Sequence, residues 1–463
     1  MSTPCVVVAG LESGPVVSLV AGALAAGYAT QRRVRPILIG LDTVLWRLLY
    51  EGPGRAPRVL DPALHTQAAT AELFEHWTED VDLAIVVAAR PLLDSWEGVK
   101  GSRPVDVAAR LDAPLLVVLD ARERGATAAA LVVGARALAG AADVGGIITV
   151  GLDESTDGRE LGRALREHAG LPLLGGIPPQ LAEQYVRQLA VLTGAVKSIG
   201  LRPPQNAGLR LCAEAASYIR LDDIDAIAAR RGYLPAVTRK LFAREPRLMD
   251  GGLSLAVGWG PPLQPMGLEN IDILQAAGVE MRPLNIARDP GLPSGISGLL
   301  LAGQLDEDAL AGFAANRRLI AELARAVDAG LPTLAFGGGA LLLLRRLSDS
   351  RGRSHQMVGA IPAEAELIEW YTRPRYVRVA ATRQNPYDIG DNVLYELFDL
   401  EYLVLEQGSF AYGVRTGSGD AKAEGFAFHR CLATSLYPSM ALSPAMADRF
   451  VETMRLAGTW EQR

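Results

Sequence analysis

The sequence predicts an α/β protein made of two doubly wound domains. The chain has 463 residues, more than a single hydrophobic core of ordinary size accommodates. Short, continuously apolar segments alternate with helical segments, a pattern typical of parallel strands whose sheet is covered on both faces. The alternation occurs twice, on either side of a polar, arginine-rich stretch. We therefore expect one domain over residues 1–195, a helical connector over residues 196–250 and a second domain over residues 251–463.

The first domain contains six apolar runs with the length and composition of buried strands. The predicted strands are residues 5–10, 35–40, 82–90, 113–121, 145–150 and 171–178. The segments between several of them have helical character. The predicted helices are residues 16–28, 61–77, 125–139 and 158–170.

The second domain repeats the alternation and adds β-rich runs near its end. The predicted strands are residues 253–260, 280–286, 298–303, 402–408 and 410–416. An amphipathic pattern over residues 306–330 predicts one long helix that ends at Gly330. Residues 331–347 are predicted to form a strand, a tight turn and a helix, and residues 443–458 a final helix.

Composition and charge argue against several classes of protein. Apolar residues make up 49% of the chain and charged residues 21%, with a net charge of −6. Basic residues come closest to a cluster at Arg230, Arg231, Arg239 and Lys240. A solvated surface explains this group as well as binding does, so no nucleic-acid partner is expected. No apolar stretch approaches the roughly 20 residues that span a bilayer, and the first residues lack the basic region of a signal peptide. We therefore expect a cytoplasmic protein without membrane association.

Cysteine and histidine residues show no spacing typical of a disulfide framework or a metal site. The three cysteines, at positions 5, 212 and 431, are far apart. His429 lies two residues before Cys431, which on a strand places both on one face, but a packed and inert cysteine is the simpler interpretation. No metal and no cofactor are expected.

The first predicted strand is followed by a glycine-containing turn and a helix, which is the setting of a phosphate-binding loop. A working loop, GxxxxGK[ST], cradles phosphate with backbone N–H groups and neutralises it with lysine. The turn keeps the outline of such a loop, with Gly10, Ser13, Gly14 and Ser18 in place. Val16 stands where glycine permits the turn, Val17 stands where the lysine belongs, and Glu12 adds a negative charge. A turn that was never a phosphate loop explains these residues equally well, and both interpretations argue against ATP binding in the usual mode.

Short motifs along the chain resemble, in order, those of the cobyrinic acid a,c-diamide synthase family. Residues 40–42 (GLD) and 58–62 (RVLDP) resemble its "GPD" and "NLDP" stretches. Further similar segments are residues 92–94, 101–102, 111–114, 119–122, 175–178, 269–270, 314–317, 357–362 and 425–426. The resemblance implies a P-loop-like N-terminal domain of the dethiobiotin-synthetase type, which is ATP-dependent in the family. It also implies a class I glutamine amidotransferase-like C-terminal domain.

The resemblance further implies that the side chains for glutamine hydrolysis are missing. The family's nucleophile turn "ECGG" falls on residues 336–339, which places Gly337 at the cysteine position. Its "SYxHLH" segment falls on residues 434–439, which places Tyr437 at the histidine position. Glutamine hydrolysis needs a thiolate activated by a histidine base, so we expect no glutaminase activity.

Three other functional stretches of the family are also altered. The acidic "EGV" segment falls on residues 87–89 (VAA), the adenine-binding "LN" pair on residues 149–150 (TV) and the oxyanion turn "GGGYPE" on residues 302–307 (AGQLDE). Together with Val17 in place of the P-loop lysine, these losses imply a catalytically degenerate member of the family, a pseudoenzyme.

Polar and aromatic residues persist at the carboxyl ends of the predicted strands, where ligands bind in open α/β sheets. The candidate ligand-binding residues are Ser18, Asp42, Arg90, Asp94, Trp96, Asp120 and Arg122. The two guanidinium groups suit carboxylate ligands, and the indole suits stacking on a ring. Alternatively, the aspartates cap loops and each arginine pairs with a neighbouring aspartate.

The sequence therefore leads to a hypothesis of a non-catalytic protein that binds an anionic tetrapyrrole, a related small molecule or a protein partner. The ligand class comes only from analogy with the family, which acts on cobyrinic acid or a related tetrapyrrole. One alternative is an amide synthase, or another enzyme of cobalamin-type tetrapyrrole biosynthesis, with an altered mechanism. Another is a structural subunit of an active paralogue. Assembly into a homo-oligomer is compatible with each of these hypotheses.

Overall fold

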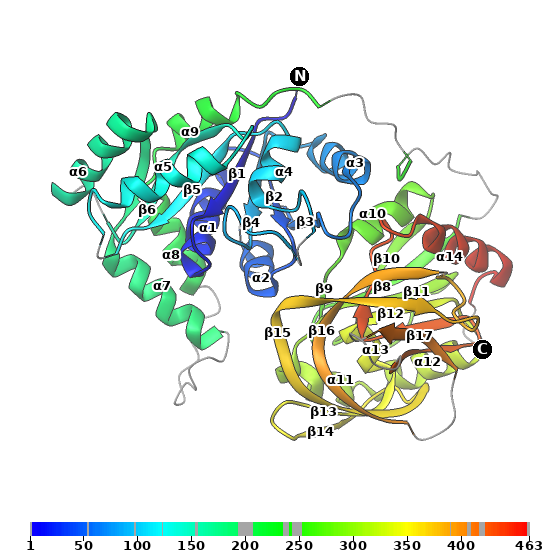
Figure 1. Cartoon of the computed structure of the whole chain (residues 1–463). Helices are drawn as coiled ribbons and strands as arrows, with labels where there is room; N and C mark the ends of the chain where they lie inside the picture. Colours follow the sequence, from blue (N-terminus) through cyan, green and yellow to red (C-terminus); the bar gives the residue numbers. More distant parts are fainter. Residues whose placement is uncertain are drawn as a thin grey trace. The chain divides into compact units, whose positions relative to one another are not determined.

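A computed structural model of the chain describes residues 2–52, 55–96, 99–122, 124–152, 156–192, 207–234, 240–242, 252–388, 390–404, 409–415 and 422–460. The chain forms two compact units, residues 1–238 and residues 239–463 (Figure 1). Each unit contains its own sheet, so the predicted fold class of two α/β domains is confirmed.

The first unit is built on a parallel sheet of seven strands in the order β3-β2-β4-β1-β5-β6-β7. The strands are β1 (Cys5–Gly10), β2 (Val34–Ile39), β3 (Arg58–Leu60), β4 (Leu83–Ala88), β5 (Leu115–Asp120), β6 (Val144–Val150) and β7 (Leu173–Ile177). Every residue of β1, β2 and β4 is buried, because helices cover both faces of the sheet. All six predicted strands of this domain are present, and the short β3 adds an edge that the apolar pattern did not mark.

The helices of the first unit follow the strands in alternation. They are α1 (Pro15–Ala29), α2 (Thr43–Glu51), α3 (Gln67–Thr78), α4 (Pro104–Arg110), α5 (Ala128–Leu138), α6 (Thr156–Ala164) with the π-turn η1 (Leu165–Ala169), α7 (Pro179–Leu192), α8 (Ala207–Ala216) and α9 (Leu221–Ala228). α1 packs both on the sheet and on α8. Its glycines permit this close approach, since a Cβ on Gly22 would lie 2.4 Å from Sγ of Cys212 in α8. Enclosure by the sheet and α8 explains why α1 is almost entirely apolar.

The first unit extends past the predicted boundary at residue 195. α8 and α9 pack on α1, and α9 also contacts β1. Arg231, just after α9, is buried, and its guanidinium donates to the carbonyl oxygens of Thr3 and Leu111 at 3.2 Å. Residues 207–234 of the predicted connector over residues 196–250 thus form a helical layer of the first unit. Of the basic group noted in the sequence, Arg231 has this structural role, and Arg239 lies outside the described residues.

The second unit contains a 13-stranded mixed sheet whose parallel part has the order β10-β8-β11-β12-β19. Its strands are β8 (Ser254–Trp259), β9 (Leu263–Pro265), β10 (Glu280–Asn285), β11 (Gly298–Leu305), β12 (Thr333–Gly337), β13 (Leu344–Ser348), β14 (Ser354–Gln356), β15 (Ile361–Ala381), β16 (Asp391–Val404), β17 (Phe410–Arg415), β18 (Lys422–Phe428), β19 (Cys431–Thr434) and β20 (Leu436–Tyr437). β15 and β16 form a long antiparallel pair, drawn in yellow and orange in Figure 1. β16 also pairs with the short β20. Because β20 directly follows β19, this pairing brings the β15–β16 pair to the end of the parallel strands.

The helices of the second unit are α10 (Leu268–Ala276), the 3-10 turn η2 (Glu307–Ala309), α11 (Leu310–Ala315), α12 (Arg317–Asp328), α13 (Gly338–Leu342) and α14 (Pro444–Ala457). The prediction of a single helix over residues 306–330 is therefore wrong in one respect, because the structure interrupts this helix at Asn316. This residue leaves the helical conformation, and its side chain donates to the carbonyl oxygen of Asp289 at 2.9 Å. The same side chain caps α12 by accepting from the backbone N–H of Leu319.

Within the described ranges, none of the helices has the length and apolar character needed to cross a membrane.

Candidate functional site

The turn between β1 and α1 keeps the outline of a phosphate loop but is lined with apolar contacts. β1 ends at Gly10 and α1 begins at Pro15. Val16 and Val17 are buried, with 5% and 7% of their surface exposed. Val17 packs back on the end of the strand, since its Cγ2 lies 2.6 Å from where a Cβ on Gly10 would be. The position at which the resemblance predicts lysine is therefore an apolar contact.

The hydroxyl of Ser18 is used inside the first unit. It donates to the carbonyl oxygen of Pro15 at 2.7 Å and accepts from the hydroxyl of Tyr185 in α7 at 2.9 Å. Only 8% of Ser18 is exposed. The structure thus directs this candidate residue toward α7.

A carboxylate and a guanidinium meet beside the same turn. Oε1 of Glu12 lies 2.7 Å from Nη1 of Arg124, and about half of the glutamate side chain is exposed. A carboxylate next to the amino end of α1 occupies the kind of environment that a phosphate would take in a working loop.

The strand order β2-β4-β1-β5 brings most of the remaining candidate residues to one edge of the sheet. The strands are parallel, so their carboxyl ends lie together. Asp42 follows β2 and caps α2, accepting from the backbone N–H groups of Val44 and Leu45 at 3.1 and 2.9 Å. This is the role of a helix N-cap, which the sequence analysis gave as the alternative to ligand binding.

Arg90, Asp94 and Trp96 follow β4. Trp96 is 3% exposed and packs against Gly40, where a Cβ would lie 2.3 Å from the indole. Gly40 has a φ of +72°, so both its conformation and this contact require glycine. The guanidinium carbon of Arg90 lies 5.3 Å from the centre of the Trp96 ring, and Asp94 is exposed. At this end of β4 the exposed groups are charged, and the indole belongs to the core.

Asp120 and Arg122 form a two-pronged ion pair after β5. Nε and Nη2 of Arg122 donate to the carboxylate at 2.9 and 2.6 Å. Burial would raise the pKa of Asp120, but the hydrogen bonds and charge of Arg122 outweigh burial and lower it. The alternative in which an arginine pairs with a neighbouring aspartate thus holds for Arg122.

In the second unit, β12 and α13 are joined by a sharp turn at Gly337. This residue has a φ of 58° and a ψ of −126°, a conformation that strains any residue with a Cβ. Gly339 is equally constrained, since a Cβ there would lie 1.9 Å from the carbonyl oxygen of Leu301. The turn is a strand-to-helix elbow of the kind that presents a nucleophile, but here it carries no side chain.

The space beside Gly337 is filled by side chains from two other strands. A Cβ on Gly337 would lie 3.0 Å from Cδ1 of Leu397 in β16 and 3.6 Å from Cδ2 of Tyr437 in β20. It would also lie 2.9 Å from the carbonyl oxygen of Gly303 in β11. Leu397 was not a candidate in the sequence, because nothing near it indicates that β16 reaches the elbow.

Tyr437 is a buried structural residue. Its hydroxyl donates to the carbonyl oxygen of Met266, and its ring meets the edge of Phe336 at 5.9 Å between centroids. Burial, reinforced by the charge of Glu269, raises the pKa of Tyr437 well above its ordinary value. Asn270 fixes the adjoining segment, donating to Pro438 O at 2.9 Å and accepting from the backbone N–H of Met440 at 2.7 Å.

The three cysteines lie away from the turn at Gly337. All three are free and buried, and burial raises the pKa of Cys431. Cys431 is thus packed in the core, as the simpler interpretation of the sequence expected. Among the residues that the structure describes, no group of three or more His, Cys, Asp and Glu side chains is placed to hold a metal ion.

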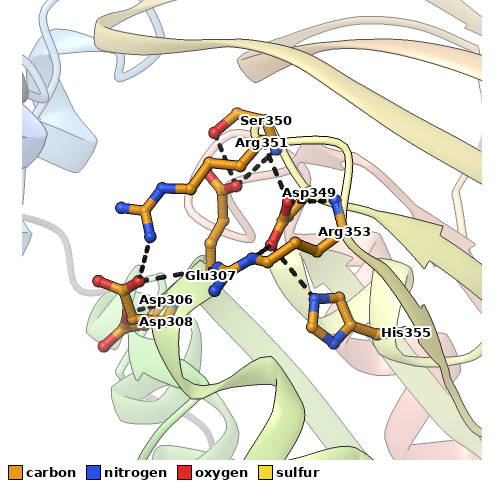
Figure 2. Close-up of polar contacts among 8 residues, drawn as sticks. All are labelled: Asp306, Glu307, Asp308, Asp349, Ser350, Arg351, Arg353 and His355. Atoms are coloured by element: carbon orange, nitrogen blue, oxygen red, sulfur yellow. Dashed lines mark hydrogen bonds and ion pairs between the residues drawn. The ribbon is translucent and has the colours of Figure 1, made fainter.

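The turn after β11 is tied to the β13–β14 hairpin by a polar cluster, which we call the hairpin clasp (Figure 2). The residues of the clasp are Asp306, Glu307, Asp308, Asp349, Ser350, Arg351, Arg353 and His355. Glu307 accepts from the backbone N–H and the hydroxyl of Ser350 at 2.6 and 2.8 Å. Asp349 is buried at its centre and accepts from Nε of Arg353 at 2.7 Å and from Nε2 of His355 at 3.2 Å. Glu307, the last residue of the expected oxyanion turn, thus makes structural contacts.

Replacing Asp349 by asparagine should destabilise the second unit by about 1–3 kcal/mol at neutral pH, since an amide turns a donor toward these N–H groups. Burial would raise the pKa of Asp349, but the hydrogen bonds from Arg353, His355 and Arg351 outweigh it and lower the pKa. The carboxylate therefore stabilises the fold above its ordinary pKa, and this contribution is lost as the pH falls through the lowered value. Thermal unfolding should show a lower melting temperature for Asp349→Asn than for the unaltered chain at neutral pH. The difference between the two melting temperatures should become smaller in strong acid.

The matched control is Asp308→Asn, which alters an ion pair with Arg351 whose carboxylate is 36% exposed. It should change stability by less than about 1 kcal/mol. Equal losses of stability in Asp349→Asn and Asp308→Asn would contradict a special role for the buried carboxylate of Asp349.

No family model matches the chain, but curated proteins match it over nearly its whole length. It is 25% identical over 443 residues to the cobyrinate a,c-diamide synthase of Magnetococcus marinus, covering 93% of this chain and 92% of that protein. It is 26% identical over 468 residues to the hydrogenobyrinate a,c-diamide synthase of Mycobacterium tuberculosis, covering 97% and 98%. Both alignments run through the two units.

Two solved structures each match less than half of the chain. A glutamine amidotransferase has a TM-score of 0.33 at 16% identity, covering 44% of this chain and 100% of that chain. The cell division protein MinD of Aquifex aeolicus has a TM-score of 0.28 at 15% identity, covering 46% and 96%.

The strand orders, the altered phosphate-loop turn and the glycine elbow define a tandem α/β protein, and its sequence similarity extends through both units. Over nearly its whole length, the chain is similar to curated members of the cobyrinate a,c-diamide synthase family, at about 25% identity.

Proposed function

We propose that this chain is a non-catalytic member of its family that binds an anionic tetrapyrrole, or a related polycarboxylate, without converting it. The observation that carries the proposal is the filled elbow. Gly337 supplies no nucleophile, and Leu397 and Tyr437 occupy the space that a nucleophile and its base would need.

The chemistry of amide transfer from glutamine supports this proposal. A thiolate attacks the side-chain carbonyl only if a base of suitable pKa stands beside it. The hydroxyl of Tyr437 donates to Met266 O, and its pKa is raised well above the ordinary value, so it does not accept a proton at neutral pH. The dyad expected from the resemblance therefore has no functional substitute in these two residues.

The first unit supports the same proposal for nucleotide chemistry. No lysine stands at residue 17, Ser18 is engaged by Tyr185, and Glu12 places a carboxylate beside the start of α1. Each feature disfavours a phosphate at this turn: the first two remove a partner, and the carboxylate of Glu12 already pairs with the guanidinium of Arg124 beside the turn.

The proposed ligand class rests on the relatives and on two arginines. The relatives are named for cobyrinate and hydrogenobyrinate, which carry several carboxylates. Arg90 and Arg122 follow β4 and β5 at the edge where open α/β sheets bind ligands. The Arg122 side chain is 40% exposed, and the guanidinium carbon of Arg90 lies 5.3 Å from the centre of the Trp96 ring. Guanidinium groups held in this way can add a carboxylate of a ligand to their existing contacts.

The double variant Arg90→Ala/Arg122→Ala tests the ligand site with hydrogenobyrinate as the probe. Each charged contact is worth about 1.5–3 kcal/mol, so loss of both should weaken binding at least about a hundredfold in calorimetry. The melting temperature should change little. The matched control is Arg33→Ala/Arg187→Ala, which removes two exposed arginines of surface ion pairs elsewhere in the first unit.

Absence of binding by the unaltered chain, or undiminished binding by the Arg90/Arg122 variant, would exclude this ligand site. In the first case a protein partner would become the better hypothesis for the chain.

A further inference from the structure

The turn after β1 is bonded on both sides to the segments that carry the arginines of the first unit's site. The carbonyl oxygen of Gly10 accepts from the backbone N–H of Leu92, after β4, at 2.8 Å. The N–H of Leu11 donates to the last part of β5 at 3.1 Å. Arg124, two residues after Arg122, follows β5 at this same edge, and its guanidinium reaches the turn.

Charged groups at this edge are nearly balanced, with a small excess of carboxylates. The described residues in the turn after β1 and at the ends of β2, β4 and β5 carry three guanidinium groups and four carboxylates, on Arg90, Arg122, Arg124, Glu12, Asp42, Asp94 and Asp120. An anionic ligand gains little from a surface whose own carboxylates neutralise its arginines. One of these carboxylates therefore has to move aside to leave a guanidinium for the ligand.

Three of the four carboxylates are unsuited to this exchange. Asp42 accepts from two backbone N–H groups as the cap of α2, so its removal would weaken the helix. Asp120 is bound by two nitrogens of Arg122, and 18% of its side chain is exposed. Asp94 is exposed, and in the described part of the chain its carboxylate forms no ion pair with an arginine, so its withdrawal frees no guanidinium.

Glu12 is the carboxylate that is most easily displaced. Half of its side chain, 51%, is exposed, and among the described residues its one ion pair is the 2.7 Å contact with Nη1 of Arg124. Exposed ion pairs of this kind contribute little to stability, so exchanging the Glu12 carboxylate for another one costs little. The exchange would leave Arg124 with the same type of partner in the same place.

We propose that Arg124 is a third ligand-binding arginine of this site and that Glu12 is its internal competitor, which a carboxylate of the ligand displaces. The inference rests on the proposed function, since it takes the tetrapyrrole polycarboxylate as the ligand. Arg124 binds the incoming carboxylate by a charge-assisted contact like the one it makes with Glu12. Glu12 makes the site selective for ligands with several carboxylates, because these reach Arg90 and Arg122 at the same time and so compete better than a single carboxylate.

Calorimetry with hydrogenobyrinate tests the two roles. Glu12→Gln removes the competing charge at nearly constant size and should tighten binding about tenfold relative to the unaltered chain. Arg124→Ala should weaken binding at least about tenfold, because it removes a charged contact and leaves the Glu12 carboxylate without its partner beside the turn. The matched control is Glu183→Gln, which releases Arg187 from an exposed pair on α7 and should bind as the unaltered chain does.

The outcomes separate this inference from the proposed function. If the unaltered chain binds hydrogenobyrinate and either Glu12→Gln or Arg124→Ala leaves the affinity unchanged, the inference is overturned and the proposed function stands. If Glu12→Gln binds and the unaltered chain does not, the competitor role of Glu12 is supported and the proposed function fails for the unaltered chain. Absence of binding by both proteins would overturn both. The melting temperatures of the variants should stay close to that of the unaltered chain, because the two side chains are 51% and 37% exposed.

Discussion

Replacing Gly337 by cysteine is expected to restore no glutamine hydrolysis. Ammonia release should stay at background, because the new thiol has no base: the Tyr437 hydroxyl is buried, donates to Met266 O and has a raised pKa. Loss of a nucleophile or its base costs a hydrolase about a million-fold in kcat, so replacing one of the two leaves most of the loss in place.

The same substitution should also destabilise the second unit. A side chain at a φ of 58° costs about 1–3 kcal/mol, and the Cβ would meet Leu397 and Gly303 at 3.0 and 2.9 Å. Gly337→Ala is the matched control, since it adds the Cβ without the thiol and should lower the melting temperature similarly.

A triple variant separates the missing groups from the filled space. Gly337→Cys/Leu397→Ala/Tyr437→His supplies the thiol, removes the leucine that packs against it and replaces the phenol with an imidazole. Its cysteine should react with iodoacetamide faster than the cysteine in Gly337→Cys alone. Glutamine turnover by the unaltered chain or by Gly337→Cys alone would contradict the placement of these residues.

Titration with Mg²⁺ and ATP is expected to show no saturable binding up to millimolar nucleotide, which corresponds to a binding free energy weaker than about −4 kcal/mol. The physical reasons are the missing cation at Val17, the engagement of Ser18 by Tyr185 and the carboxylate of Glu12. Calorimetry makes the measurement. A dissociation constant in the low micromolar range would contradict the interpretation of the turn.

The variant Glu12→Gln/Val17→Lys tests the cause, because it removes the carboxylate and supplies the lysine. It should bind nucleotide more tightly than the unaltered chain. Glu183→Gln/Arg187→Lys, which alters an exposed pair on α7, should not.

Elements with a continuous apolar pattern could be predicted from the sequence, and short or interrupted elements could not. β1 and β4 are runs of buried residues, and burial on both faces produces the pattern that predicts them. β3 and β20 have three and two residues, too few for any period. The break at Asn316 was missed because the amphipathic pattern continues through it, whereas the hydrogen bond from its side chain to the carbonyl oxygen of Asp289 involves another segment.

The candidate site shows the same division between local and distant causes. The positions of the altered turn and the elbow follow from local motifs, and the strand order brings Asp42, Arg90 and Arg122 to one edge of the sheet. Burial of Trp96 depends on its contact with Gly40, and the filled elbow depends on Leu397, which lies 60 residues from Gly337. Contacts of that kind arise from tertiary packing and leave no periodic signal in the sequence.

The most direct measurement incubates the purified chain with hydrogenobyrinate, glutamine, ATP and Mg²⁺ and analyses the tetrapyrrole by mass spectrometry. An active synthase of the family, run in parallel, provides the control for the substrates. The proposed function predicts that the tetrapyrrole keeps its mass, with no ammonia released from glutamine. Appearance of a mono- or diamide at a rate proportional to the amount of this chain would contradict the central claim that it binds without catalysing.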